Sequence, residues 1–189
     1  MNILMAGVGG QGIILASDVL SEVMMRHGLD VKKSEIHGMA QRGGSVVSHI
    51  RFSKAVSSPI ISLAECDMLL SFEELETARY TKYMNSSTNV IINKFRQSPP
   101  EVIAGAEVYP DILPIIREKT QKVHTVDGTA LCHEIGNPKG VNIVLLGVLS
   151  KFLDAHADLW IETLNDMLAE KIRKKNIEGF LKGRALNTN

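Results

Sequence analysis

The sequence predicts an α/β fold, namely a Rossmann-like doubly wound sheet with a hairpin insertion and C-terminal helices. Three observations predict it. An apolar run over residues 2–6 ends at a glycine-rich turn over residues 7–12, and residues 13–27 then place apolar side chains at helical spacing. Residues 29–36 return to a strand pattern, which completes the strand–turn–helix–strand unit found in doubly wound sheets. Further short apolar runs alternate with helical segments towards the C-terminus.

The first helix and the segment behind it have recognisable boundaries. Gly28 follows the helical pattern as a C-terminal cap, because glycine tolerates the left-handed conformation in which many helices end. Residues 45–52 alternate like a strand with one apolar face. Since a glycine-rich loop joins them to residues 29–36, we expect a hairpin or a bent strand pair.

The second half of the chain alternates strands and helices. The expected strands cover residues 66–72, 89–93 and 122–126. The expected helices cover residues 73–84, 110–121, 129–135, 141–153, 157–172 and 176–182. The helix over 141–153 is nearly all apolar and should be central, whereas Pro114 should bend its own helix or fix its first turn. The sequence has no internal repeat, low-complexity tract or long linker, so we expect one domain over residues 1–189.

Composition narrows the class of protein. Lysine plus arginine number 21, as do aspartate plus glutamate, so the formal net charge is zero. This balance argues against nucleic acid as the main partner, because phosphate binding leaves a basic surface. It also offers little electrostatic resistance to association, which suits a subunit of a complex and leaves an isolated chain free to form a homodimer. Without a signal-peptide pattern or an apolar run of about 20 residues, we expect a cytoplasmic protein that does not enter a membrane.

Cysteine and histidine spacing gives no support for a metal site. Cys66 and Cys132 lie far apart and form no CxxC pair, so we expect two buried thiols rather than an iron–sulfur or zinc site. His49 alternates along an expected strand and is read as a hydrogen-bonded sheet residue. The histidines that show no ligand spacing are His27, His124, His133 and His156.

Residues 7–12, GVGGQG, satisfy the pattern G-x-G-x-x-G between a strand and a helix. Glycines let the backbone approach a ligand closely, and the helix that follows offers unpaired N–H groups to an anion. Glu35 stands where a ribose-binding acid is expected in a dinucleotide fold. Nucleotide binding, contact with an anion or cofactor fragment, and helix-on-strand packing all remain open for this turn. Its candidate cofactor-binding residues are Gly7, Gly9, Gly10, Gln11 and Gly12.

A polar loop over residues 35–45, EIHGMAQRGGS, is the second unusual feature of the sequence. Together with the glycine turn, the string SEIHGMAQRGGSVVSHIR resembles the gamma-type subunit of the 2-oxoacid:ferredoxin oxidoreductases. Among these it is most similar to the beta (small) subunit of indolepyruvate ferredoxin oxidoreductase. The resemblance covers nearly the whole chain and continues in residues 109–112, 126–130, 145–147 and 176–183 and in Asn142.

The resemblance implies a division of labour between subunits. Enzymes of this family oxidatively decarboxylate a 2-oxoacid, form an acyl-coenzyme A and pass electrons to ferredoxin. Thiamine diphosphate with Mg²⁺ and 4Fe–4S clusters do this chemistry. The present sequence lacks the GDG-type diphosphate motif and has only two cysteines. We therefore expect this chain alone to bind none of these cofactors and to be inactive by itself. A large (alpha) partner subunit would supply them.

The resemblance also suggests what the polar loop contacts. We expect it to close over the partner's active site or over coenzyme A, the co-substrate. His37 could then transfer a proton, Arg42 could hold a carboxylate or phosphate in a bidentate pair, and Gln41 could hydrogen-bond a carbonyl. Gly38, Gly43 and Gly44 would permit the turn, and the latter two join the candidate cofactor-binding residues. The alternative is a hairpin tip that serves only a subunit interface.

Three functions remain open from the sequence. The first is the small subunit of an oxidoreductase for arylpyruvates such as indolepyruvate. The second is a stand-alone dinucleotide-binding oxidoreductase, and the third is a non-catalytic scaffold subunit.

Two local features also have two interpretations each. Asn142 is either a buried hydrogen-bonding anchor or a ligand contact, and the basic run over residues 171–175 is either a solvated helix end or a docking patch for ferredoxin or the large subunit.

Overall fold

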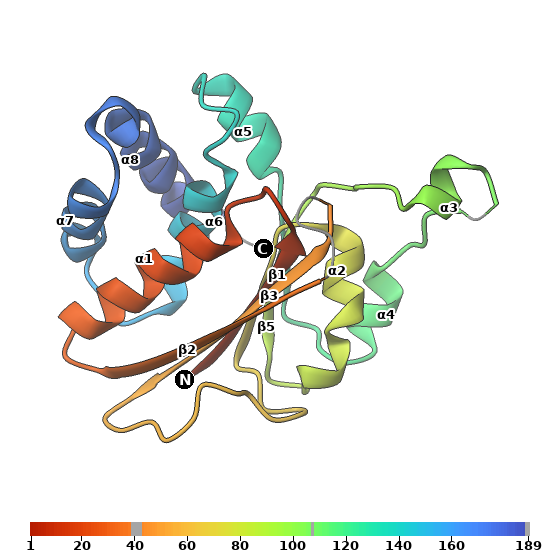
Figure 1. Ribbon diagram of the computed structural model, residues 1–189, viewed down its shortest axis with the longest axis horizontal. Helices are drawn as coiled ribbons and strands as arrows, with labels where there is room; N and C mark the ends of the chain where they lie inside the picture. Colours follow the sequence, from red (N-terminus) through yellow and green to blue (C-terminus); the bar gives the residue numbers. More distant parts are fainter. Residues whose placement is uncertain (39–42, 107, 188–189) are drawn as a thin grey trace.

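A computed structural model describes residues 1–38, 43–106 and 108–187 of the chain. A six-stranded sheet forms its centre, with the strand order β2-β3-β1-β4-β5-β6 (Figure 1). Strands β1, β4, β5 and β6 run parallel, whereas β3 runs antiparallel to both of its neighbours. The strands are β1 (Asn2–Val8), β2 (Asp30–His37), β3 (Ser45–Ser53), β4 (Met68–Ser71), β5 (Asn89–Asn93) and β6 (Val123–Val126).

Helices cover both faces of this sheet, as a doubly wound fold requires. One face carries α1, α6, α7 and α8, and the other carries α2 and α4 (Figure 1). The longer helices are α1 (Ile13–Arg26), α6 (Val141–Leu149), α7 (Ala157–Met167) and α8 (Glu170–Ala185). The short ones are α2 (Glu74–Arg79), η1 (Thr81–Tyr83), α3 (Pro100–Ile103), α4 (Leu113–Arg117), α5 (Gly128–Glu134) and η2 (Ser150–Phe152). The predicted α/β class is confirmed.

The predicted hairpin is confirmed and occupies an unusual place. β2 and β3 pair antiparallel, and β3 also pairs with β1, so that it lies between the two strands joined by α1. A short loop can only return the chain beside the strand it has just left, because a parallel neighbour needs a long crossover. β3 is buried along most of its length, whereas β2 is half-exposed at the sheet edge.

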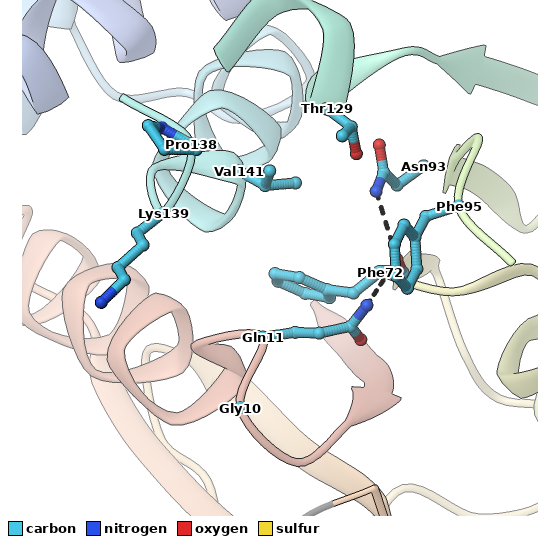
Figure 2. A pocket seen from close by; sticks show the side chains of 9 residues that line it. All are labelled: Gly10, Gln11, Phe72, Asn93, Phe95, Thr129, Pro138, Lys139 and Val141. Carbon is cyan, nitrogen blue, oxygen red and sulfur yellow. Dashed lines mark hydrogen bonds between the residues drawn. The ribbon is translucent and has the colours of Figure 1, made fainter. Parts of the chain in front are cut away.

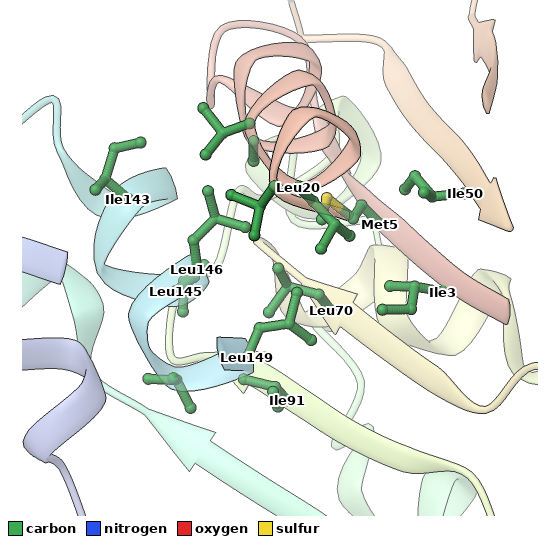
Figure 3. Close-up of a cluster of buried hydrophobic side chains, with 14 of the residues drawn as sticks. Ile3, Met5, Leu20, Ile50, Leu70, Ile91, Ile143, Leu145, Leu146 and Leu149 are labelled. Atoms are coloured by element: carbon green, nitrogen blue, oxygen red, sulfur yellow. The ribbon is translucent and has the colours of Figure 1, made fainter. Parts of the chain in front are cut away.

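Alternating side chains on each central strand divide the core into two layers. Ile3 and Met5 on β1 face α1 and α6, and Leu4 and Ala6 face α2 and α4. Figure 3 shows the larger layer, where Leu20 of α1 and Leu146 of α6 meet the apolar side chains of the strands. All of α6 from Asn142 to Leu149 is buried, which confirms that the apolar helix is central.

The pair formed by α6 and α8 packs backbone against backbone. A Cβ atom built on Gly147 would lie 2.1 Å from the carbonyl oxygen of Phe180. One built on Gly183 would lie 2.1 Å from that of Val144. Only glycine permits such an approach, so small residues rather than an apolar stripe define this contact.

Several predicted boundaries were wrong. The helix expected over residues 157–172 ends at Met167, and α8 is much longer than the expected 176–182. Only Leu113–Arg117 of the expected 110–121 is helical, with its proline in the first turn. The segments expected as helices over 73–84 and 141–153 each end in a separate 3₁₀ turn. Among the described residues, no helix combines the length and apolarity needed to cross a membrane.

Candidate functional site

The carboxyl ends of the four parallel strands open onto one cavity (Figure 2). β1 leads into α1 on one face of the sheet and β4 leads into α2 on the other, so this edge is a topological switch point, where ligands bind in open α/β sheets. The cavity has a volume of about 380 Å³. Its lining residues are Gly10, Gln11, Phe72, Asn93, Phe95, Thr129, Pro138, Lys139 and Val141.

The glycine turn shapes one wall of this cavity. Gly10 and Gly12 adopt left-handed backbone conformations, with φ of 106° and 78°. Gly7 has no room for a side chain, since a Cβ would lie 2.6 Å from Gln11 Oε1 and 2.8 Å from Phe72 Cβ. The turn therefore needs glycine both for its curvature and for its contact with β4.

Gln11 holds the turn together with its own side chain. Its Oε1 accepts a hydrogen bond from the backbone N–H of Val8 at 2.7 Å, and its Nε2 donates to the carbonyl oxygen of Phe72 at 3.2 Å. The same carbonyl accepts from Asn93 Nδ2 at 3.3 Å (Figure 2). Asn93 Oδ1 in turn accepts from the backbone N–H of Gly128 at 3.0 Å. Gln11 and Asn93 thus fix the relative positions of the strand ends. Sequence reasoning missed Asn93, which looks like an ordinary strand end.

Asn142 joins two helix N-termini. Its Nδ2 donates to the carbonyl oxygen of Gly12 at 3.3 Å, which supports the interpretation of Asn142 as an anchor. In the described part of the chain, no side chain caps the first turn of α1 or of α6. The partial positive charges of the two helix N-termini lie near each other, because Asn142 of α6 bonds to Gly12 at the start of α1. Lys139 lines the same cavity. This arrangement favours an anion.

The base of the polar loop lies directly against the glycine turn. The N–H of Gly9 donates to the carbonyl oxygen of Gly44 at 2.8 Å. In return, the N–H of Gly43 donates to the carbonyl oxygen of Gly9 at 3.5 Å. Below them the hairpin closes through Gly38, whose N–H donates to Ser45 O at 2.7 Å. The two features that the sequence predicts separately are therefore one structural unit.

His37 is the candidate catalytic residue that the structure places. It ends β2 with a half-exposed side chain and lines a second pocket, of about 310 Å³, on the other side of the glycine turn. Gln41 and Arg42, the other two candidates, lie outside the described residues. The second pocket is lined by Gly9, Gly10, Gly12, Ile13, Ile14, His37 and Val46.

Glu35 has partners of its own. Its Oε1 accepts from Lys33 Nζ at 2.7 Å and from Ser17 Oγ at 3.4 Å, and its Oε2 lies 3.9 Å from His37 Nε2. Lys33 also forms an ion pair with Asp18 of α1. The carboxylate that the sequence suggests for a ribose is thus neutralised by a lysine and directed at α1.

Known proteins resemble this chain over nearly its whole length. Residues 2–186 match the family model described as pyruvate ferredoxin/flavodoxin oxidoreductase. The chain belongs to this family. Over 192 residues it is 34% identical to the indolepyruvate oxidoreductase subunit IorB of Archaeoglobus fulgidus, covering 100% of this chain and 94% of the relative. It is 36% identical over 154 residues to the subunit of the same name in Thermococcus kodakarensis, covering 79% and 76%.

Solved structures of 2-oxoacid:ferredoxin oxidoreductases share the fold. The gamma subunit of the keto/oxoacid ferredoxin oxidoreductase from Geobacter sulfurreducens superposes with a TM-score of 0.71 at 19% identity, over 96% of this chain and 95% of that one. The 2-oxoglutarate:ferredoxin oxidoreductase from Magnetococcus marinus superposes with a TM-score of 0.77 at 22% identity. All of the present chain matches 32% of that longer one, so the fold also occurs there within a larger polypeptide.

The chain's own thiols do not suit the iron–sulfur clusters that the family resemblance implies. Burial raises the pKa of the Cys66 thiol to about 12 and that of Cys132 to about 11, so neither thiol is ionised near neutral pH. Within the described ranges, no group of three or more His, Cys, Asp or Glu side chains could hold a metal ion. What the site offers to a ligand is an edge with two helix N-termini and a histidine.

Proposed function

We propose that the chain is the small subunit of a 2-oxoacid:ferredoxin oxidoreductase that acts on arylpyruvates such as indolepyruvate. The complex would decarboxylate the oxoacid oxidatively, form an acyl-coenzyme A and pass electrons to ferredoxin. The large (alpha) subunit would hold thiamine diphosphate, Mg²⁺ and the 4Fe–4S clusters, and this chain would act beside it in the cytoplasm as a single domain. Family membership and the names of relatives at 34–36% identity support this assignment.

One observation carries the proposal. The glycine turn and the base of the polar loop, which lie far apart in the sequence, are joined by the Gly9–Gly44 hydrogen bond and flank a pocket that also contains His37. An edge built in this way presents backbone N–H groups, two helix N-termini that no described side chain caps, and an imidazole to a ligand that comes from outside the chain.

Coenzyme A is the ligand that this edge fits best. Its phosphates are anionic and would be stabilised by the N-termini of α1 and α6 and by Lys139. Gly7, Gly9, Gly10, Gly12, Gly43 and Gly44 would let the backbone approach it, while Gln11 keeps the turn in shape. His37 would hold or move a proton, Arg42 would bind a carboxylate or phosphate, and Gln41 would hydrogen-bond a carbonyl.

A stand-alone dinucleotide-binding oxidoreductase is the second candidate, because the G-x-G-x-x-G turn forms as that motif requires. Two observations count against it. The carboxylate of Glu35 already accepts a hydrogen bond from Lys33. In addition, β3 separates β1 from β2, which lie side by side in a dinucleotide fold. A rise in melting temperature with NAD or FAD, in the chain alone, would favour this second function.

Reconstitution tests the proposal. The chain and its large subunit, mixed with indolepyruvate, thiamine diphosphate and coenzyme A, should reduce a viologen dye, and the chain alone should not. Arg42→Ala should then raise the Michaelis constant for coenzyme A or indolepyruvate about tenfold or more, as expected for the loss of a charge-assisted pair. The exposed Arg117 of α4 provides the control, and Arg117→Ala should leave both constants unchanged. Full activity of the large subunit alone would show that the chain serves only as a scaffold.

A further inference from the structure

A buried carboxylate connects α2 to the base of the hairpin. Glu76 is only 5% exposed, although it lies on a short helix at the surface of the sheet. Its Oε2 accepts a hydrogen bond from the hydroxyl of Ser45 at 2.5 Å. The hydroxyl of Tyr80 lies 3.1 Å from the same Ser45 Oγ. Ser45 is thereby held from the side of α2 by two polar groups.

Ser45 occupies the point where the hairpin meets the glycine turn. It is the first residue of β3 and lies opposite Val8 of β1. Its carbonyl oxygen closes the hairpin by accepting from Gly38, and the residue before it, Gly44, accepts from Gly9. A shift of Ser45 would therefore move the hairpin base and the glycine turn together.

The N-terminal cap of α2 is supplied by a residue other than Glu76. Glu73 already caps α2, since its carboxylate accepts the N–H of Glu76 at 2.8 Å. Burying a second carboxylate one turn further on costs free energy unless it is well hydrogen-bonded. Ser45 supplies one such bond, and Arg79 lies 3.2 Å from the other oxygen of Glu76. One oxygen of the carboxylate thus faces the hairpin, and the other pairs with Arg79 on its own helix.

We propose that Glu76 is a positioning residue of the site, which acts through Ser45 to hold the glycine turn in the arrangement that receives the anionic co-substrate. The identity of the co-substrate rests on the proposed function, whereas the positioning of the glycine turn by Glu76 does not. Glu76 touches no ligand in this scheme. It fixes the hydroxyl of Ser45 and, through Gly44, the N–H of Gly9.

Protonation of Glu76 should weaken this support. Glu73, Arg79 and Tyr80 are the titratable groups that face it. Burial raises the pKa of Glu76, and the hydrogen bond from Ser45 and the charge of Arg79 oppose that rise. An ionised carboxylate is the stronger acceptor, so binding of the co-substrate should weaken as the pH falls into the titration range of Glu76.

Hydrogen exchange in the isolated full-length chain tests the positioning without any assay of activity. Ser45→Ala and Glu76→Gln should speed exchange in the peptides that contain the glycine turn and the hairpin base, by about tenfold for the loss of a hydrogen bond to a charged group. Ser45→Thr, which keeps the hydroxyl, should exchange like the wild type. The matched control is Glu74→Gln on the same helix, which breaks the ion pair with Arg96 and should leave these peptides unchanged.

Kinetics of the reconstituted complex tests the consequence. Ser45→Ala should raise the Michaelis constant for coenzyme A about tenfold and change kcat less than about twofold, and Glu76→Gln should flatten the acid limb of the pH profile of that constant. Wild-type exchange and kinetics in both variants would overturn the proposal, as would an equal effect of Glu74→Gln. If the wild-type complex showed no coenzyme A dependence, the proposed function would fail, while hydrogen exchange would still decide whether Glu76 positions the turn.

Discussion

His49 is a buried histidine whose surroundings favour its neutral form. It is 1% exposed on β3, its Nδ1 accepts from the backbone N–H of Ile61 at 3.2 Å, and its ring meets Tyr83 edge-on. An imidazole that accepts at Nδ1 carries its proton on Nε2 and is neutral. The interpretation of His49 as a hydrogen-bonded sheet residue agrees with the contact at Nδ1, whereas Nε2 has no hydrogen-bond partner among the described residues. Burial lowers the pKa of His49 below its ordinary value of 6.5.

Acid should therefore destabilise the chain through His49. Between the lowered pKa and 6.5, the unfolded state binds a proton that the folded state excludes, so the free energy of unfolding falls as the pH drops through that window. Urea unfolding at several pH values should show a smaller fall in His49→Gln than in the wild type. Glu76, whose pKa burial raises, acts in the opposite direction in both proteins and cancels in the comparison. Equal pH slopes would show that His49 does not contribute to this fall.

Gly7 is a second residue whose surroundings fix its identity. Alanine there would place a methyl group 2.6 Å from Gln11 Oε1 and 2.8 Å from Phe72 Cβ, so Gly7→Ala should lower the free energy of unfolding by about 2 kcal/mol. Gly28 provides the control, because it has a positive φ and nothing within 4 Å of a Cβ. Gly28→Asn should stay within about 0.5 kcal/mol of the wild type. Equal losses in urea unfolding would contradict the crowding at Gly7.

At the scale of elements, the sequence predicts strands and helices better than their arrangement. A continuous apolar run predicts β1, which is buried on both faces, and the spacing of apolar residues predicts α1 and the strands of the hairpin. β3 lies between β2 and β1, so both of its faces are buried, whereas β2 at the sheet edge is half-exposed. The compositions of the two strands agree with these positions, because SVVSHIRF of β3 is more apolar than DVKKSEIH of β2. The full length of α8 could not be read from apolar spacing, since its contact face includes Asn176, Gly179 and Gly183.

The site shows the same limit. The glycine turn and the polar loop are each recognisable from local sequence, but their contact arises from the strand order, which brings Gly9 beside Gly44. Asn93 and Glu76 carry no motif and look like the ends and faces of ordinary elements. Their roles depend on partners far along the chain, Gly128 and Ser45, and only the fold brings those together.

The close packing of α6 on α8 gives a sharp prediction at this scale. Gly183→Ala would place a methyl group 2.1 Å from the carbonyl oxygen of Val144, so the helices must separate, and we expect a loss of about 3 kcal/mol or more in the free energy of unfolding. Gly179 lies on the same helix, and a Cβ there would meet only side-chain atoms, at 3.2 Å and 3.3 Å. Gly179→Ala also gains helix propensity and should be nearly neutral. Similar unfolding midpoints for the two variants would contradict this packing.

At the scale of the whole molecule, the proposed function makes the chain one part of a site that its partner completes. Its formal charge is zero, so long-range electrostatics does not keep it from a partner. The two pockets lined by Gly10 flank a turn at the edge of the sheet, where a second subunit could reach them. By contrast, the side chains of Cys66 and Cys132 are both fully buried.

Removing both thiols tests this division of labour directly. Cys66 and Cys132, with pKa values of about 12 and 11, stay protonated near neutral pH and should not bind iron. The double variant Cys66→Ala, Cys132→Ala, reconstituted with the large subunit, should therefore keep the iron content and the dye-reduction rate of the wild-type complex. Its melting temperature should fall, because each substitution leaves a small cavity in the core. A drop in iron per complex with assembly intact would mean that this chain ligates a cluster after all, and the assignment of all redox chemistry to the partner would have to be abandoned.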